Sequence, residues 1–291
     1  MDPFAASVAN LLVGNNEKSP VLEMHFPAPE IFFEEDAMVS VTGGNFSGYI
    51  DAELMPSWTP VFIKKNRSLS FKKFVSGARG YLAIQGGIKC DNWLGSFSTH
   101  TKIKKGGHHG RPLLKNDVVS FNSTAPVFPI KTFPHLNPLI SAVYQSTYNI
   151  RCIGGPEWDR VNDRSKAVFS QLPFSITAQS DRMGYRLKGP ELSLCETVEL
   201  ISSPVDYGTI QLLPNGQLVI LMADHQTTGG YPRIAQVINA DLPRLAQSPV
   251  HSELHFEMIA VENAADALFS LYQTMGSIKA NCNNFYDAHR H

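Results

Sequence analysis

The chain has 291 residues, 43% of them hydrophobic and 18% charged, a composition typical of a protein with a sizeable buried core. The 25 basic and 26 acidic residues leave a formal net charge of −1, which argues against nucleic acid or an anionic membrane as a partner. No apolar run is long enough to cross a membrane, and the N-terminus lacks a secretory pattern. We therefore expect a cytoplasmic protein of one large domain or two ordinary ones.

The first half of the chain predicts one helix followed by short strands. Asp2 is a suitable helix N-cap, Pro3 suits the first helical position, and Gly14 suits the end of the helix. Apolar or alternating runs, separated by Gly, Pro, Asn and Ser, then predict a mainly antiparallel sheet curled into a barrel or a sandwich. The predicted strands are Val21–Phe26, Ala37–Thr42, Pro60–Lys64, Gly80–Gln85 and Val118–Phe121.

The second half has a similar texture, so two related β domains are expected. Residues 123–147 contain four prolines and few charges, which is typical of a linker. A strand at Tyr148–Ile153 and a helix from Gly155-Pro156 to about Ser170 follow, then strands and helices to the end. The further strands are Phe174–Ala178, Val198–Ser202, Thr209–Leu213, Gln217–Met222, Ile234–Ile238 and His255–Val261. The further helices are Asp241–Gln247 and Glu262 to about Ala280, before a loose polar tail.

These patterns divide the chain into an N-terminal β domain over residues 1–122, the linker, a C-terminal β domain over 148–261, and a helix with its tail over 262–291. The cysteines are scattered without a Cys-x-x-Cys pair, and we interpret them as reduced packing residues. They are Cys90, Cys152, Cys195 and Cys282.

The densest chemistry lies in residues 222–233, MADHQTTGGYPR, which follow an apolar strand. Acid, imidazole, amide and hydroxyl groups here precede two glycines, whose backbone N–H groups can approach a ligand because no Cβ intervenes. A polar connecting loop is the alternative. The candidate residues are Asp224, Gln226, Thr227, Thr228, Gly229, Gly230 and Tyr231.

A second dense stretch, SDRMGYRLKG, begins at Ser180. Arg182 and Arg186 could clamp a carboxylate or phosphate, or Asp181 could pair with one of them and fix a loop. Together with Asp224, the two stretches suggest arginines for an anion and an acid for proton handling. Nucleotide-binding and hydrolase motifs such as G-x-x-x-x-G-K-[ST] are absent from the sequence, and no Ser or Cys has an evident activating base.

Two further features lie in the first half. His108 and His109 are adjacent, and on a strand their side chains would diverge, so no metal site is expected. Gly106-Gly107, Gly110 and Arg111 are equally compatible with an anion-binding turn and with a plain hairpin tip.

Long strings through the chain resemble the allophanate hydrolase subunit 2 family, also called the biotin-dependent carboxyltransferase-like family. The strings SDRMGYRLKG, ISSPVDYGTIQLLPNG and LVILMADHQTTGGYPRIAQVINADLPRLAQ carry the resemblance in the second half. MDPFAASVANLLVGN, RGYLAIQGGI, LGSFSTHTKIKKGGHHGRPLLKNDVV and IRCIGGPEWD carry it in the first. It covers nearly the whole chain, from Met1 to about Val261.

The resemblance implies a mainly β fold of two tandem cyclophilin-like β-barrel domains with a few short helices. It also implies a subunit 1, or B-type, partner protein and a site near the shared surface. In 5-oxoprolinase members a LamB/YcsF-like A-type partner joins, and the complex binds ATP to open 5-oxo-L-proline to glutamate. Relatives act as the carboxyltransferase part of urea carboxylase, which uses biotin, and this chain has no biotin-attachment motif of its own. Others are regulators that antagonise a sporulation kinase inhibitor.

On the family motifs, Asp224, Arg182 and Arg186 become the expected catalytic residues. The expected substrate-binding residues are Ser180, Asp181, Gln211, Gln226, Thr227, Thr228, Gly229, Gly230 and Tyr231. The chain departs from the family pattern in three places. Members commonly carry a preceding strand with a VQDxGR-like motif, so the first barrel is expected to lack a strand. His100 stands where Asp is common, and Asn116-Asp117 replaces a Gly-Asp turn, which Asn tolerates.

Overall fold

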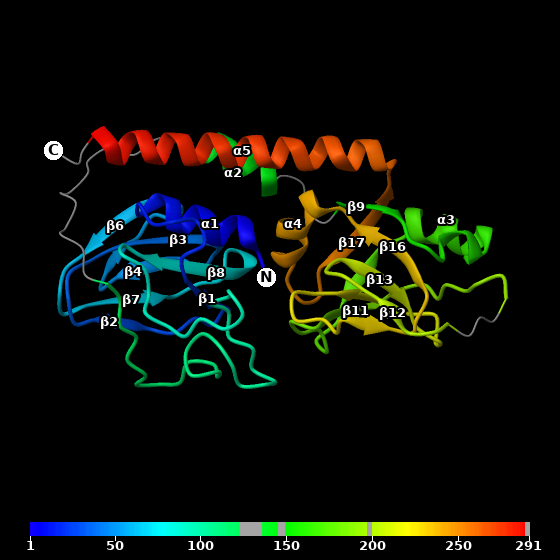
Figure 1. The fold of residues 1–291 in the computed structure, drawn as a ribbon, viewed down its shortest axis with the longest axis horizontal. Helices are drawn as coiled ribbons and strands as arrows, with labels where there is room; N and C mark the ends of the chain where they lie inside the picture. Colours follow the sequence, from blue (N-terminus) through cyan, green and yellow to red (C-terminus); the bar gives the residue numbers. More distant parts are fainter. Residues whose placement is uncertain (123–135, 145–148, 197–199, 289–291) are drawn as a thin grey trace. The chain divides into compact units, whose positions relative to one another are not determined.

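The computed structural model describes residues 1–122, 136–144, 149–196 and 200–288 (Figure 1). The chain divides into two compact units. The N-terminal unit is Asp2–Ile140 with Thr274–His291, and the C-terminal unit is Met1 with Ser141–Gln273. Within the described ranges, no helix combines the length and apolarity that a membrane span requires.

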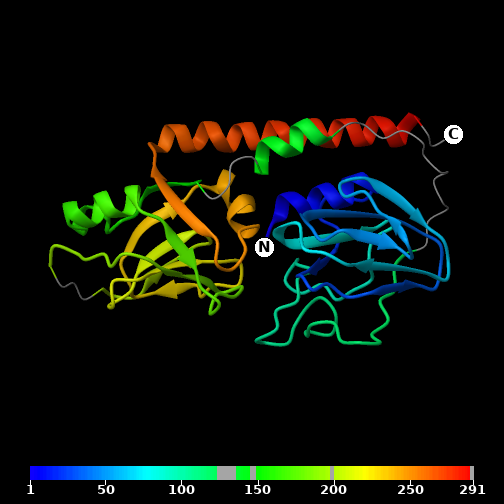
Figure 2. The ribbon, with the colours of Figure 1, turned by 180° about the vertical axis from the view of Figure 1, so that it is seen from behind.

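The N-terminal unit begins with the expected helix, α1 (Pro3–Leu12). The Asp2 carboxylate accepts a hydrogen bond from the Ala5 amide at 2.9 Å, so the predicted cap is confirmed. The helix lies on a sheet containing strands β3 (Ala37–Asn45) and β8 (Ser76–Ile84) (Figure 2), where strand hydroxyls donate to helix carbonyls. Ser40 Oγ donates to the Ala9 carbonyl at 2.6 Å, and Thr42 Oγ1 donates to the Ala5 carbonyl at 2.8 Å.

The strands of this unit form two four-stranded sheets. Residues from both sheets, such as Val39, Leu69 and Leu82, share one buried core. The described strands do not close into a ring here, so the structure shows a sandwich-like pair of sheets in this unit. One sheet has the order β1 (Leu22–Met24), β8 (Ser76–Ile84), β3 (Ala37–Asn45), β6 (Pro60–Ile63). The other has the order β2 (Ile31–Phe33), β7 (Arg67–Phe71), β4 (Gly48–Ile50), β5 (Glu53–Leu54).

The C-terminal unit is a closed seven-stranded barrel, which confirms the expected barrel architecture for this half. Closure comes from β17 (Glu253–Met258), which pairs antiparallel with β10 (Phe174–Ile176) and parallel with β9 (Asn149–Gly154). The strand order is β10 (Phe174–Ile176), β11 (Gly184–Lys188), β14 (Leu218–Leu221), β13 (Thr209–Leu212), β16 (Arg233–Val237), β9 (Asn149–Gly154), β17 (Glu253–Met258).

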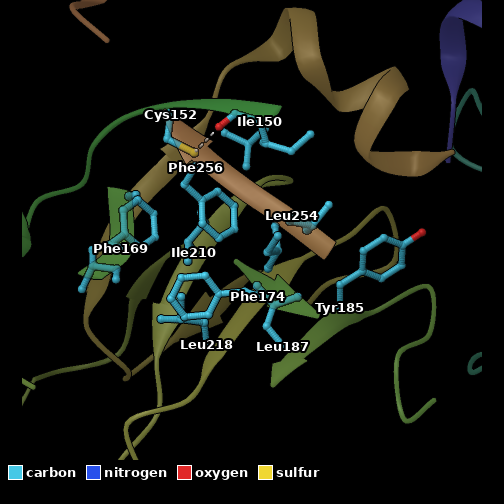
Figure 3. Close-up of a cluster of buried hydrophobic side chains, with 14 of the residues drawn as sticks. Ile150, Cys152, Phe169, Phe174, Tyr185, Leu187, Ile210, Leu218, Leu254 and Phe256 are labelled. Atoms are coloured by element: carbon cyan, nitrogen blue, oxygen red, sulfur yellow. Dashed lines mark hydrogen bonds between the residues drawn. The ribbon is translucent and has the colours of Figure 1, made fainter. Parts of the chain in front are cut away.

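Aromatic and aliphatic side chains fill the barrel (Figure 3). Phe169 and Phe256 stack with ring centroids 4.7 Å apart, which joins helix α3 (Asp163–Gln171) to β17. Phe174 lies 5.7 Å from Phe256 in a tilted arrangement. Because these rings interlock inside a closed sheet, the barrel is a packed and rigid support for its end loops.

Several expected elements differ from the structure. The helix expected from Gly155 is a short 3₁₀ turn, η1 (Trp158–Arg160), followed by α3, because the Asn162 side chain caps a new start by accepting from the Ser165 amide at 2.8 Å. The expected strand Val118–Phe121 is reduced to a single bridge between Ile88 and Phe121.

The expected strand Val198–Ser202 falls partly on residues 197–199, outside the described ranges, and its described residues are not in a strand. The short strand β12 (Ser203–Pro204) follows it and pairs with β15 (Thr228–Gly229). Sequence patterns missed β11 because it has only five residues and directly follows the polar turn that begins at Ser180. The 3₁₀ turn η2 (Asn239–Asp241) and α4 (Leu242–Ala246) occupy the predicted helix near Asp241.

Two helices lie where a linker and a loose tail were expected. Most of residues 123–147 lies outside the described ranges, but α2 (Asn137–Tyr144) occupies part of it. The last helix, α5 (Val261–Ala288), continues to residue 288, so the expectation of a loose tail is wrong up to there. Its end is fixed because buried Tyr286 donates to the Leu12 carbonyl at 2.6 Å.

The cysteines are only partly the packing residues that the sequence suggested. Cys152 and Cys282 are buried, and Cys90 is half-buried. Cys195 is exposed, which corrects the packing interpretation for that position.

Candidate functional site

The two polar stretches meet at one end of the C-terminal barrel. Strands β11 and β14 pair antiparallel with Gly184 opposite Leu221, so the segment before β11 and the segment after β14 leave the barrel together. The ladder extends beyond the strands, because the Met222 amide donates to the Met183 carbonyl at 3.0 Å and the Asp224 amide donates to the Arg182 carbonyl at 2.8 Å. The predicted proximity of these stretches is therefore a property of strand register.

Arg182 and Asp224 form a bidentate ion pair at this end. Arg182 Nε donates to Asp224 Oδ2 at 2.8 Å, and Arg182 Nη2 donates to Asp224 Oδ1 at 3.1 Å. The side chains are 33% and 26% exposed, so a ligand from solvent can reach both. A planar guanidinium that holds both carboxylate oxygens fixes the orientation of the acid as well as its position.

Ser180 and Asp181 shape the turn that carries Arg182. The Asp181 carboxylate accepts hydrogen bonds from the amides of Met183 and Gly184 at 2.8 and 3.1 Å. Ser180 Oγ accepts from the Arg186 amide at 3.0 Å. Asp181 therefore acts on the backbone, and the alternative in which it pairs with one of the arginines is wrong.

Arg186 is not brought to the ion pair. It lies within β11, where its neighbours Tyr185 and Leu187 face the core and Arg186 itself is exposed on the outer face. Within the described part of the chain its guanidinium forms no ion pair. Strand alternation thus separates the two arginines that the sequence grouped together.

The loop at residues 226–231 presents its polar groups to solvent. Gln226, Thr227, Thr228, Gly230 and Tyr231 are all exposed, and only Gly229 is half-buried. The loop is held by the β12–β15 pairing and by the Val205 amide, which donates to the Thr227 carbonyl at 3.1 Å. Hydroxyls and amides are therefore available to a ligand on a supported ribbon.

Gln211 lies beneath this ribbon. Ile210 and Leu212 belong to the barrel core, and Gln211, on the opposite face of β13, is only 2% exposed. Its Nε2 is buried without a hydrogen-bond partner among the described residues. A Cβ on Gly229 would lie 2.5 Å from that nitrogen, so the glycine is required here for close packing and does not adopt a left-handed backbone.

An ion pair that sequence patterns missed supports the loop from below. Arg233 donates from Nη2 to Glu157 Oε1 at 2.9 Å and from its backbone amide to Glu157 Oε2 at 2.8 Å. Burial alone would raise the pKa of Glu157, but the hydrogen bonds from Arg233 outweigh it and the pKa is lowered. The two residues are 76 positions apart, and only the glycines before Glu157 hinted at a close backbone approach.

The histidine-rich turn of the N-terminal unit differs from the expected diverging histidines and from the expected use of Arg111 in an anion-binding turn. His108 and His109 lie in a turn with ring centroids 4.5 Å apart, so their side chains do not diverge. Arg111 is engaged in a bidentate pair with Asp117 at 2.6 and 2.8 Å, which holds the pKa of that carboxyl well below its usual range. His100 stands where family members commonly have Asp, and its backbone forms an isolated antiparallel β-bridge with Lys105. In the described ranges no group of three His, Cys, Asp or Glu side chains is placed to hold a metal ion.

Comparisons with known proteins give one consistent result. The sequence profile described as "Carboxyltransferase domain, subdomain A and B" matches residues 1–258. The chain is 35% identical to the C-type component of 5-oxoprolinase from Escherichia coli (strain K12) over 269 residues, which is 92% of this chain and 84% of that protein. It is 32% identical to the same component of 5-oxoprolinase from Haemophilus influenzae over 271 residues, 91% of this chain and 83% of that protein.

Among solved structures, the urea carboxylase of Kluyveromyces lactis superposes with a TM-score of 0.86 at 25% identity. The match covers 96% of this chain and 26% of that one, so the chain spans about a quarter of the larger protein. The matched part of the yeast protein and the present chain therefore have the same fold.

Proposed function

The chain belongs to the carboxyltransferase-domain family of subdomains A and B, and on this basis we propose that it is the C-type component of an ATP-dependent 5-oxoprolinase in the cytoplasm. The observation that carries the proposal is 35% identity across 84% of a bacterial protein of that name. The complex would include a B-type partner and a LamB/YcsF-like A-type partner, and the chain alone is expected to be inactive.

The proposed reaction opens a five-membered lactam. Water adds to the lactam carbonyl, the C–N bond breaks, and the ring nitrogen leaves with a proton as an amine. This chemistry requires a group that holds the substrate carboxylate, donors for the developing oxyanion and an oriented acid or base.

The Arg182–Asp224 end of the barrel offers groups of these types. Arg182 holds the Asp224 carboxylate in a fixed orientation, and in our proposal Asp224 handles the proton at the ring nitrogen. The exposed hydroxyls of Thr227 and Thr228 supply hydrogen bonds to the substrate carboxylate or the oxyanion.

ATP is assigned to the partner proteins of the complex. The segments 180–184 and 222–231 contain no lysine and no phosphate-binding glycine loop, so the described residues at this end do not fit a nucleoside triphosphate. When bound elsewhere in the complex, ATP supplies the driving force for opening a stable amide. In this proposal the residues of this chain bind and orient the substrate and transfer a proton to it.

Reconstitution tests the proposal. The purified chain and its B-type and A-type partners are mixed with 5-oxo-L-proline, and glutamate release is measured with and without ATP. We expect release only with all three proteins and ATP, and a loss of at least about a hundredfold for Asp224→Asn. Lys188→Gln, an exposed cation on β11, is the matched control and should retain activity. Full activity of Asp224→Asn would remove Asp224 from the mechanism.

A carboxyltransferase role is the second candidate, and the TM-score of 0.86 to a urea carboxylase favours it. Under that proposal biotin comes from another domain or protein, and a carboxyl group passes to a urea-like acceptor. Incubating the chain with carboxylated free biotin and urea, and following carboxyl transfer, separates the two functions. Transfer to urea in the absence of 5-oxoprolinase activity would favour the second.

A further inference from the structure

A cavity of about 400 Å³ lies within the N-terminal unit and is lined by residues of that unit alone. Its walls come from three segments, residues 89–91, 107–109 and 118–120, and a backbone bridge between Asp91 and Gly107 joins the first two. The lining residues are Lys89, Cys90, Asp91, Gly107, His108, His109, Val118, Val119 and Ser120. The lining therefore combines hydrogen-bond donors with two valines.

His108, one of the lining residues, has a buried ring nitrogen without a hydrogen-bond partner among the described residues. Its Nε2 lies 3.5 Å from Asp117 Oδ2 and makes no hydrogen bond among the described residues. Asp117 Oδ2 already accepts two hydrogen bonds, from Arg111 Nη1 at 2.6 Å and from the Leu114 amide at 2.7 Å. A buried polar group without a partner destabilises a fold, so the described part of the protein alone leaves this nitrogen unsatisfied.

The backbone adds donors beside this imidazole. His109 and Gly107 have positive φ angles of 51° and 56°, a left-handed conformation that also occurs in anion-binding turns. The amides of Gly107 and Gly110 are used by the carbonyls of Asp91 and Gly106. Those of His108 and His109 have no protein acceptor among the described residues, so they are available to an anion.

Charge and polarity define the ligand class. Lys89 supplies an ammonium group and Asp91 a carboxylate, so these two charges balance and the unpartnered amides provide the remaining donors. Burial raises the pKa of the Cys90 thiol, which keeps it neutral. Val118, which is 71% exposed, and Val119 form an apolar wall. An exposed valine in a donor-lined cavity suits a ligand that has both a hydrocarbon face and an anionic group.

We propose that this cavity binds a small organic carboxylate. Its carboxylate oxygens accept hydrogen bonds from Lys89 and from the backbone amides of His108 and His109, and its hydrocarbon part packs on Val118 and Val119. This binding belongs to the chain itself and requires neither ATP nor a partner protein, so it is testable independently of the lactam-opening activity.

Calorimetric titration of the full chain with cyclopentanecarboxylate tests the proposal. Cyclopentylmethanol, which has the same ring without the charge, and inorganic phosphate, which has charge without the ring, are the comparison probes. We expect the carboxylate to bind at least about tenfold more tightly than either. Absence of carboxylate binding, or equal binding of phosphate, would overturn the proposal.

Two variants with matched controls locate the site. Val118→Asp places a negative charge on the exposed wall and should abolish binding, whereas Val75→Asp, at another exposed valine of the same unit, should leave it unchanged. Lys89→Met should weaken binding at least about tenfold, and Lys64→Met, at an exposed lysine, should not. Retained binding in Val118→Asp would place the ligand elsewhere and overturn the proposal.

Discussion

Arg182 and Asp224 lie 42 positions apart in the sequence and meet through two parallel hydrogen bonds of 2.8 and 3.1 Å. The pair stands at an open end of a closed barrel, and backbone hydrogen bonds between the same two segments hold it in register. The acid and the arginine therefore form one unit, in which each determines where the other points.

The first prediction concerns this unit. Arg182→Lys keeps a positive charge but cannot hold both oxygens of Asp224, so the carboxylate loses its fixed orientation. We expect kcat for glutamate release in the reconstituted complex to fall at least about tenfold, with little change in thermal stability because the pair is partly exposed.

Asp224→Asn combined with Arg182→Lys should be no worse than Asp224→Asn alone, because residues that act as a unit are not additive. Arg186→Lys serves as the comparison at an exposed position on β11. Additive losses in the double variant would show that the two residues act separately.

The second prediction concerns the ion pair beneath the loop. Because the pKa of Glu157 is lowered in the folded protein, its stabilising contribution is present above the unfolded value of about 4.3 and is lost as pH falls through the folded value. Glu157→Gln should lower the unfolding free energy at pH 7 by about 1–3 kcal/mol.

The difference between wild type and Glu157→Gln should shrink below about pH 4.3, as protonation removes the carboxylate from the wild type as well. Thermal unfolding of both proteins from pH 7 to pH 3 measures it. Glu196→Gln, at an exposed carboxylate of the same unit, is the control. A gap that stays constant across this range would contradict the assignment.

The third prediction separates stability from activity at Gln211. Gln211→Met keeps the shape of the side chain and removes a buried amide that has no partner for its Nε2 among the described residues. The unfolding free energy should rise by about 1 kcal/mol, because an unsatisfied donor is no longer buried. Activity should fall, because the same amide faces the Gly229 ribbon of the proposed site.

Gln217→Met is the matched control for that variant. The Gln217 side chain is satisfied by the amide and carbonyl of Gly189, at 3.2 and 3.3 Å, so removing it should not stabilise the protein. Equal stability changes in the two variants would contradict the interpretation of Gln211.

The fourth prediction compares the two adjacent glycines. Gly229→Ala places a Cβ 2.5 Å from Gln211 Nε2 and forces that buried side chain to move, at a cost of about 1–3 kcal/mol. Gly230→Ala meets its nearest atom at 3.5 Å, an ordinary contact, so stability should change by less than about 0.5 kcal/mol. Chemical denaturation measures both, and equal effects would contradict the packing argument.

The fold could be predicted from the sequence wherever the determining residues are neighbours. Asp2 and Pro3 specify the start of α1, and Ile234–Ile238 was found as a strand because its apolar residues are contiguous. Asn162 was missed as a cap because a helix pattern already surrounded it. Strand β11 was missed because it is only five residues long and begins at Gly184, whose amide still belongs to the Asp181 turn.

The sequence by itself determined the β class, the two halves and the polar segments around Arg182 and Asp224, because capping, alternation and turn chemistry act within a few residues. Only the tertiary structure decided that Arg182 and not Arg186 reaches Asp224, that Arg233 holds Glu157, and that Gln211 lies beneath Gly229. Those choices depend on strand register and barrel closure, which fix the facing of residues many positions apart.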